Sequence, residues 1–337
     1  MERDNFWDSL KFLLIFFVVY GHMIETYAPD GYFNRAMYNF IYIFHMPFFM
    51  FISGRFSQIR DRAKYKKTIV RLFETYLVFQ TIRCVKILVI SGNLDFVYDV
   101  LCPKGTLWYI AYLIIYRIYV YIFPIRYQKR YSAIILLSFF CISILWGYLP
   151  ITIGQKLLVF FLYFLLGLYS ANVDVKNICR KIPLPVALLS LFSIITIIYI
   201  YFNYNIGYVI YYDTSYFLPG SSFSSGVLCM ARLGVYATSV MISLILMRIV
   251  DAWKFFPQYG SKTLFIYMYH TFIVLGLRLL IEKRLIIENE LLLFLYTLAI
   301  IAGLVLLSEM RFWVILMTPF SYIKEYVISH KNNEKME

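Results

Sequence analysis

Residues 8–25 of the chain read DSLKFLLIFFVVYGHMIE. An apolar run of this length predicts a helix that crosses the hydrocarbon core of a membrane. Lys11 and His22 lie eleven residues apart in this run. At about 100° per residue their side chains share one helix face, separated by about 16 Å of rise. Because ionisable side chains inside a membrane cost free energy, this pair predicts a functional site.

The composition extends the membrane interpretation to the whole chain. Of its 337 residues, 61% are hydrophobic and 15% are charged, whereas soluble domains carry about 25% charged residues. We therefore expect an all-α, polytopic integral membrane protein with about ten transmembrane helices, forming one membrane domain over residues 1–337. The predicted spans lie near residues 8–26, 37–53, 69–90, 107–125, 131–149, 155–171, 185–204, 226–250, 261–281 and 290–318.

Lysine and arginine residues set the expected orientation, because cytoplasmic loops retain positive charge. With the N-terminus inside, the inner segments hold twenty of these residues and the outer segments hold five. Both termini are therefore predicted to be cytoplasmic. The five outer residues are Arg35, Lys104, Lys156, Lys283 and Arg284.

The net charge of +13 does not predict a nucleic-acid partner. The excess is spread along one edge of a membrane protein rather than gathered on a soluble face, and it is typical of topology determinants beside anionic lipid. The five cysteines show no C-x-x-C spacing and are interpreted as packing residues, so we expect neither a structural disulfide nor a metal site. They are Cys84, Cys102, Cys141, Cys179 and Cys229.

Three of the four histidines, His22, His45 and His270, fall inside predicted spans at overlapping depth. A single buried histidine is more often a hydrogen-bonded core residue than a catalyst, but three together favour chemistry for at least one. Imidazole suits the removal of a hydroxyl proton near neutral pH, because its pKa of about 6.5 lets it act as base and then as acid.

Acidic residues accompany both members of the first-helix pair. Glu25 follows His22 at i+3 and could orient the ring, while Asp8 precedes Lys11 at i+3 and could neutralise the ammonium. Structural roles are equally open for both acids. Asp8 lies where an acid caps a helix or complements its dipole, and Glu25 lies near the outer interface.

Four segments of the chain resemble the acyltransferase family three membrane proteins, especially the branch related to fucose 4-O-acetylases. The first is the basic residue, ten residues and then histidine, seen here as Lys11 to His22. The others are FHMPFFMFISGR, GTLWYIAYL and YGSKTLFIYMYH, which contain His45, Trp108 and His270 respectively. They occur in the family's order and cover essentially the whole chain. Many relatives have Arg where this chain has Lys11, which keeps the charge but loses bidentate phosphate binding.

The resemblance implies transfer of an acyl group, usually acetyl from acetyl-CoA, to a sugar hydroxyl of a cell-envelope or secreted glycan. On the predicted topology, Lys11 and Arg55 would hold the phosphates of cytoplasmic coenzyme A, and His22 would deprotonate the acceptor with Glu25 orienting its ring. A covalent acyl-histidine intermediate is the open alternative. Ser53 joins the expected donor site, while Asp8, His45, Trp108 and His270 are expected to support the chemistry. No metal is expected.

The resemblance also sets the expected location and partners. We expect a multi-pass protein of the inner (cytoplasmic) membrane whose partners are acyl-CoA, a glycan or lipid-linked sugar acceptor, membrane lipid and glycan-assembly proteins. The outer segment 205–225 is rich in tyrosine and contains no Lys or Arg, which suits sugar stacking, but an interfacial aromatic belt is the favoured interpretation of most of these rings. A transporter or flippase of a lipid-linked oligosaccharide is the alternative function, since it too needs many spans and buried cations.

Overall fold

The computed structural model describes residues 4–28, 31–91, 103, 105–148, 154–201, 225–282 and 289–325. Within these ranges every regular element is helical and no strand occurs, which confirms the all-α prediction. In the described part of the chain, six helices are long and apolar enough to cross a membrane. The total of about ten spans and the cytoplasmic termini stay predictions. The six candidates are Asn5–Ile24, Tyr32–Arg55, Leu184–Tyr201, Gly226–Ala252, Pro257–Glu282 and Glu290–Leu307.

The chain divides into two compact units. The first unit comprises Met1–Gln58 and Ile125–Ala302, and the second comprises Ile59–Pro124 and Gly303–Glu337. The later boundary falls within α13 (Glu290–Leu307), so one continuous helix contributes to both units.

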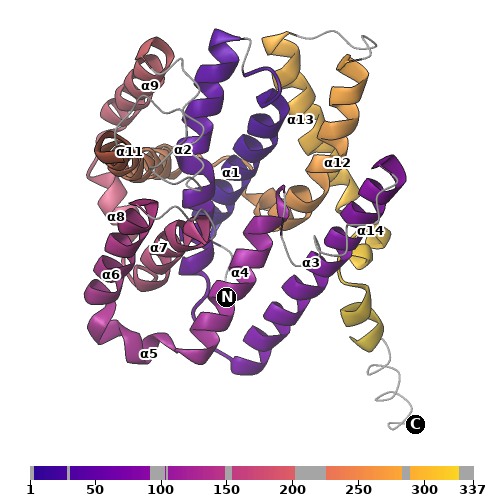
Figure 1. Cartoon of the computed structure of the whole chain (residues 1–337), viewed down its shortest axis with the longest axis horizontal. Helices are drawn as coiled ribbons and strands as arrows, with labels where there is room; N and C mark the ends of the chain where they lie inside the picture. The colour runs from indigo at the N-terminus through magenta and orange to yellow at the C-terminus, as the bar shows by residue number, and fades with distance from the viewer. Residues whose placement is uncertain are drawn as a thin grey trace. The chain divides into compact units, whose positions relative to one another are not determined.

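The first unit is built around the antiparallel helices α1 (Asn5–Ile24) and α2 (Tyr32–Arg55), which lie side by side in Figure 1. Asp4 caps α1 by accepting a hydrogen bond from the backbone N–H of Phe6. The apolar residues of α1 are largely buried, and the ring centroids of Phe17 and Phe44 lie 5.3 Å apart across the pair. This packing fixes the face on which the polar residues of α1 lie.

Helix α7 (Gln155–Tyr169) packs closely against α2. A Cβ atom at Gly54 would collide with the carbonyl of Phe164, and one at Gly167 would collide with the carbonyl of Phe51. The two glycines therefore bring the helix backbones into contact, as small residues do in membrane helix pairs. Helix α6 (Ser132–Leu145) covers the next face of α7.

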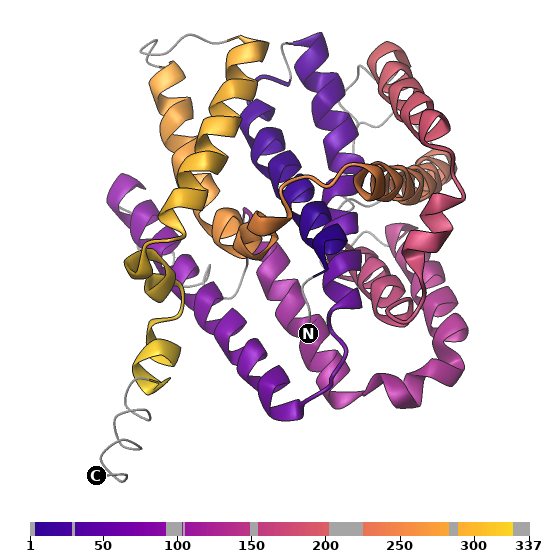
Figure 2. The same ribbon diagram turned by 180° about the vertical axis from the view of Figure 1, so that it is seen from behind.

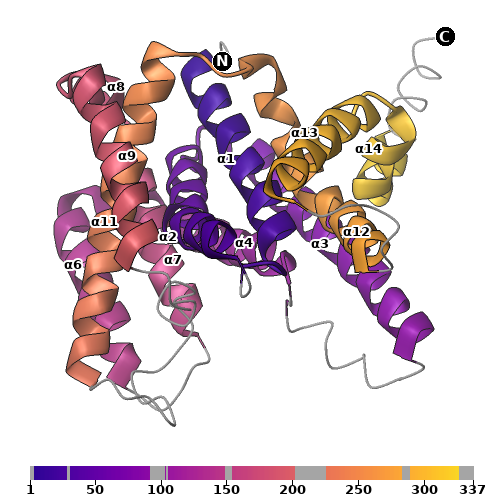
Figure 3. The same cartoon turned by 90° about the horizontal axis from the view of Figure 1, so that it is seen from above.

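Helices α9 (Leu184–Tyr201) and α11 (Ser225–Ala252) form a further pair, seen side by side in Figure 3, and both contact α2. The chain then crosses α1 through the 3-10 helix η4 (Pro257–Lys262) and enters α12 (Thr263–Glu282), as Figure 2 shows. A Cβ atom at Gly260 would collide with the backbone of Asp8. This close approach starts α12 beside the first turn of α1, so the two helices run parallel.

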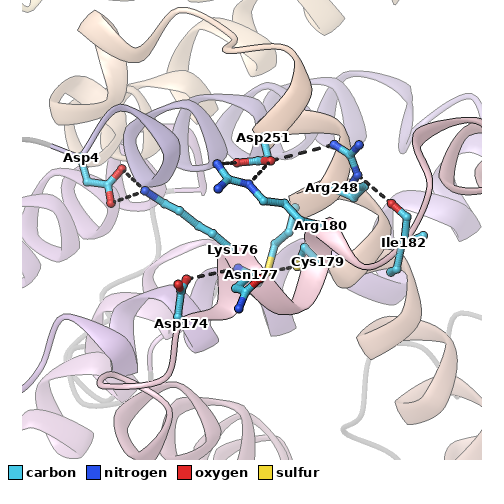
Figure 4. A network of polar contacts seen from close by, with 10 residues as sticks. Asp4, Asp174, Lys176, Asn177, Cys179, Arg180, Ile182, Arg248 and Asp251 are labelled. Atoms are coloured by element: carbon cyan, nitrogen blue, oxygen red, sulfur yellow. Dashed lines mark hydrogen bonds and ion pairs between the residues drawn. The ribbon is translucent and has the colours of Figure 1, made fainter.

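Charged residues tie the short helix α8 (Val175–Arg180) to its neighbours (Figure 4). The Lys176 ammonium lies 2.8 Å from a carboxylate oxygen of Asp4, at the start of α1. Arg180 binds both carboxylate oxygens of Asp251, at the end of α11, at 2.8 and 2.9 Å. Arg248 donates to the carbonyl of Ile182 at 2.8 Å. The first turn of α1 and the last turn of α11 are thus linked at one end of the first unit.

The second unit contains α3 (Arg62–Ser91), α4 (Leu107–Ile122), α14 (Arg311–Met317) and the helical segment 319–325. Helices α3 and α4 pack against each other, with the guanidinium of Arg62 4.7 Å from the ring centroid of Tyr121. Glu74 of α3 accepts hydrogen bonds from the backbone N–H and hydroxyl of Ser321. Glu325 lies 2.7 Å from the ammonium of Lys67.

Two predicted spans differ from the helices observed. The run predicted as 290–318 is broken at residues 308–310, where α13 ends and α14 begins. The run predicted as 131–149 consists of α6 and the 3-10 turn η3 (Trp146–Tyr148), after the short elements α5 (Ile125–Gln128) and η2 (Lys129–Tyr131). Residues 205–224 of the aromatic segment and Cys102 lie outside the described residues.

Candidate active site

His22 lies in the last turn of α1 and contacts Glu25 directly. Its Nδ1 atom lies 3.3 Å from Oε2 of Glu25, as the i+3 spacing predicts. In the neutral tautomer with Nδ1–H donating to the carboxylate, Nε2 carries a lone pair and can take a proton. Both side-chain hydrogen-bond contacts of His22 among the described residues use Nδ1. The His22 side chain is 25% exposed, so it is accessible.

Arg278 of α12 reaches the same end of α1. Its Nη2 atom lies 3.4 Å from Oε2 of Glu25 and also donates to the backbone carbonyl of His22. An ion pair this exposed adds little stability. The contact instead fixes geometry. The guanidinium of Arg278 binds the carboxylate of Glu25 and the backbone carbonyl of His22, and that carboxylate orients the His22 ring.

Two further side chains border His22. The ring centroid of His270, from α12, lies 5.3 Å from that of His22, with the planes inclined by 31°. The hydroxyl of Tyr42, from α2, lies 3.4 Å from Nδ1 of His22. Three helices thus meet at this point. The group is hereafter the histidine cluster, and its members are His22, Glu25, Tyr42, His270 and Arg278.

His45 lies next to Tyr42, a member of the histidine cluster. Its Nδ1 atom lies 2.7 Å from the carbonyl of Ile41 in the preceding turn, and its ring packs edge-to-face on Tyr42 with centroids 4.8 Å apart. The imidazole is buried. Its contact with the cluster therefore runs through Tyr42.

Tyr42 and Arg278 were not singled out as members of this site by the sequence. Tyr42 carries a usable signal, because it precedes His45 by three residues and so lies on the same face of its helix. Arg278 follows His270 by eight residues, and an arginine inside a span already indicates a polar contact. Neither signal identifies the partner, which is His22 for Tyr42 and Glu25 for Arg278.

The other residue of the opening pair, Lys11, lies in the first half of α1. Its ammonium lies 2.5 Å from Oδ1 of Asp8 and 5.7 Å from the ring centroid of Phe56. Asp8 is buried, and its backbone packs against Gly260 of the YGSK segment. A charge-balanced and partly covered ammonium is thus held where the end of α2 meets the start of α1.

Arg55 is the last residue of α2 and precedes Phe56, the ring that Lys11 approaches. Its guanidinium stacks 4.6 Å from the ring centroid of Trp7, which packs on Phe56. It also donates to the carbonyl of Ser170, and at 3.0 Å to that of Val173, just beyond the end of α7. These bonds cap α7 and use part of the five N–H donors of the group. We call Trp7, Asp8, Lys11, Arg55 and Phe56 the basic end.

The remaining predicted site residues are placed as follows. Ser53 lies in the last turn of α2, where its carbonyl accepts a hydrogen bond from the hydroxyl of Ser57 at 2.6 Å. Trp108 belongs to the second unit, where its ring packs 5.5 Å from that of Tyr112. Among the described residues, no group of three or more His, Cys, Asp or Glu could hold a metal ion.

A family model described as an acyltransferase domain, that of acyltransferase family three, matches residues 4–309. The match covers most of the chain and includes the histidine cluster and the basic end. The chain belongs to acyltransferase family three. With its apolar helices, this family membership identifies a membrane acyltransferase. Searches of curated proteins and of solved structures found no match for the chain.

Proposed function

We propose that this family-three acyltransferase moves an acyl group, in the simplest case acetyl, from cytoplasmic acyl-CoA to a sugar hydroxyl of a cell-envelope or secreted glycan. It would act in the inner membrane as one domain that uses both units, as in the branch related to fucose 4-O-acetylases. Family membership supports acyl transfer. The motif of α1, in which ten residues separate Lys11 from His22, supports acyl-CoA as the donor and histidine as the base.

The contact between His22 and Glu25 carries the proposal. A carboxylate at Nδ1 favours the tautomer in which Nε2 is the proton acceptor, and it stabilises the imidazolium that forms when the proton arrives. The same logic operates wherever a histidine base is oriented by an acid. Among the described residues, no carboxylate contacts the ring of His45, whose Nδ1 is bonded to its own helix.

The reaction follows from this arrangement. Nε2 of His22 accepts the proton of the acceptor hydroxyl while the oxygen attacks the carbonyl carbon of the thioester. The resulting tetrahedral species expels the sulfur of coenzyme A as the C–S bond breaks, and the proton on Nε2 passes to that thiolate. The products are an acyl ester and free coenzyme A, and His22 returns to its starting state.

The donor would be anchored at the basic end. Lys11 and Arg55 approach the same pair of aromatic rings, Trp7 and Phe56, so their charges can act on one polyanionic ligand. From Lys11 to His22 the helix rises about 16 Å, a distance that an extended pantetheine arm can follow. The spacing of the two residues therefore matches a donor bound at one end and reacting at the other.

The test is acyl transfer by purified protein in nanodiscs, followed by release of coenzyme A from acetyl-CoA and by ester formation on a glycan acceptor. Replacing His22 by Ala should lower kcat by about 10²-fold or more, because the general base is lost. The control is His330→Ala, which changes the one histidine outside the predicted spans and should leave kcat unchanged. Full activity of the His22→Ala protein would reject the assignment.

The same assay separates the enzyme from the alternative transporter. A transporter or flippase of a lipid-linked oligosaccharide consumes no donor, so it releases no coenzyme A. A covalent acyl-histidine route would instead give labelled protein when radioactive acetyl-CoA is added without acceptor and the mixture is quenched, and the His22→Ala protein would remain unlabelled.

A further inference from the structure

His270 is held in one tautomer by its own helix. Its Nδ1 atom lies 2.7 Å from the carbonyl of Tyr267 and 3.2 Å from that of Ile266. Since both carbonyls can only accept, Nδ1 must carry the hydrogen. The neutral ring therefore has its lone pair on Nε2, and that nitrogen can only accept a hydrogen bond.

That acceptor is buried without a donor. His270 has no exposed surface, and no donor among the described residues reaches its Nε2 atom. Buried polar atoms are nearly always hydrogen-bonded, because leaving one unmade costs the full desolvation of the group. An unpartnered acceptor at a candidate active site thus indicates a ligand that supplies the donor.

The neighbouring ring repeats this chemistry. His22 lies 5.3 Å from His270 between centroids, and its Nδ1 atom is engaged by Glu25, so its Nε2 is also an acceptor. The guanidinium of Arg278, which contacts this histidine pair through the backbone of His22, directs Nη2 to the carbonyl of His22 and to Glu25. Two imidazole acceptors therefore stand side by side.

A ligand that satisfies both acceptors must carry two adjacent donors. Thioester carbonyls and phosphate oxygens accept hydrogen bonds and cannot do this. A single isolated hydroxyl would satisfy one ring and leave the other unpaired. Two hydroxyl groups on neighbouring carbon atoms of one sugar can each donate to one ring.

We propose that the acceptor is a vicinal diol, in which the acylated hydroxyl donates to His22 and the neighbouring hydroxyl donates to Nε2 of His270. The inference rests on the proposed function and narrows its substrate class. His270 thereby becomes a specificity-determining residue that touches the substrate. The neighbouring hydroxyl is bound by His270 but is not acylated.

The test uses methyl α-fucopyranoside, and the corresponding methyl glycosides of galactose, glucose and mannose, with acetyl-CoA and the full chain in nanodiscs. NMR of the product identifies the acylated position. Each accepted glycoside is then compared with derivatives that lack one hydroxyl neighbouring that position. We expect one such deoxy derivative to have a kcat/KM at least about 10-fold lower, since a site built to hydrogen-bond a hydroxyl discriminates against its loss.

Two variants assign the effect to His270. His270→Asn keeps an amide near the position of Nδ1 but has no acceptor near Nε2, and His270→Gln can place its amide oxygen near Nε2. We expect the preference for the diol over the deoxy derivative to fall to about twofold or less in His270→Asn and to be partly retained in His270→Gln. A purely structural role would lower both rates equally and leave their ratio unchanged.

Several results would overturn the proposal. Equal kcat/KM for diol and deoxy acceptors in the unaltered protein would do so without any variant, even if both variants fail to fold. Acylation of a primary hydroxyl, which has no free neighbour in these pyranosides, would do so as well. If coenzyme A is released but the diol ratio survives in His270→Asn, only this inference fails. If no glycoside is acylated and no coenzyme A is released, the proposed function fails with it.

Discussion

Arg278 binds the carboxylate of Glu25 across two helices, with Nη2 of the arginine 3.4 Å from Oε2 of the acid. The same guanidinium donates to the carbonyl of His22. The acid that orients the imidazole is therefore itself oriented from α12, and the end of α1 cannot move away from α12 without breaking both contacts. On the proposed mechanism, the orientation of His22 should therefore depend on Arg278.

Replacing Arg278 by Gln should lower kcat by about 10-fold to 100-fold while the KM for acetyl-CoA changes little, because outer partners of a catalytic histidine act on its orientation. The matched control is Arg35→Gln, since Arg35 also donates to a backbone carbonyl, that of Ala28 at 3.1 Å, at the turn between α1 and α2. Steady-state kinetics in nanodiscs distinguish the two. Equal kcat values for both variants would show that Arg278 serves only the fold.

Glu25→Gln tests the charge at the same point. The amide can still accept a hydrogen bond from His22 but no longer stabilises its protonated form, so kcat should fall by about 10²-fold. Glu282, an exposed acid at the end of α12, offers the comparison Glu282→Gln, which should retain kcat. An unchanged rate for Glu25→Gln would leave His22 without its orienting acid and contradict the proposed mechanism.

The polar pairs within α1 were predictable from the sequence, and their partners on other helices were not. Asp8 with Lys11 and Glu25 with His22 follow from the helical period, which places i and i+3 on one face whatever surrounds the helix. The contacts of Arg278 and Tyr42 depend on how α12 and α2 pack on α1. That packing is set by many apolar contacts that no local spacing encodes.

The helix break at residues 308–310 shows a second limit of sequence reasoning. Ser308, Glu309 and Met310 lie between the apolar residues of α13 and α14, so a hydropathy average over the region stays high. The hydroxyl of Ser308 donates to the carbonyl of Val305 inside the last turn of α13, a local contact that competes with continuation of the helix. The averaged hydropathy therefore does not indicate the turn, which is seen only in the backbone structure.

Close contact of α2 with α7 predicts a strong dependence on two glycines. Gly54→Ala and Gly167→Ala each place a methyl group against a backbone carbonyl of the partner helix, so the helices must separate. Overpacking of this kind costs about 1–3 kcal/mol, and each variant should melt several degrees below the unaltered protein. Gly234→Ala, where nothing lies within 4 Å of the added methyl group, should not. Thermal unfolding in detergent, followed by tryptophan fluorescence, measures the difference.

The distribution of basic residues predicts the orientation independently of any activity. Alkaline phosphatase fused after residue 337 should be inactive and green fluorescent protein fused there should be fluorescent, because a cytoplasmic C-terminus retains both reporters inside. Alkaline phosphatase inserted at position 215, in the segment 205–225, should be active. The opposite pattern would place the basic end of α1 and α2 away from cytoplasmic coenzyme A and so remove the donor site.

Lys11 tests that donor site directly. Lys11→Gln should raise the KM for acetyl-CoA by about 10-fold, equivalent to about 1.4 kcal/mol of binding, with a smaller change in kcat. The variant also removes the ammonium that lies 2.5 Å from the buried carboxylate of Asp8, so loss of stability alone could imitate the effect. Lys176→Gln, which breaks the pair with Asp4 at the same end of the first unit, controls for loss of positive charge there.

The double variant Asp8→Asn/Lys11→Gln separates the two explanations. It also removes the charge of the Asp8 carboxylate, so stability should return towards that of the unaltered protein. If Lys11 binds the phosphates of coenzyme A, the KM should stay raised in the double variant, because the ammonium is still missing. Recovery of both stability and KM would mean that Lys11 serves only to neutralise Asp8. In that case the spacing between Lys11 and His22 would no longer measure the reach of the donor.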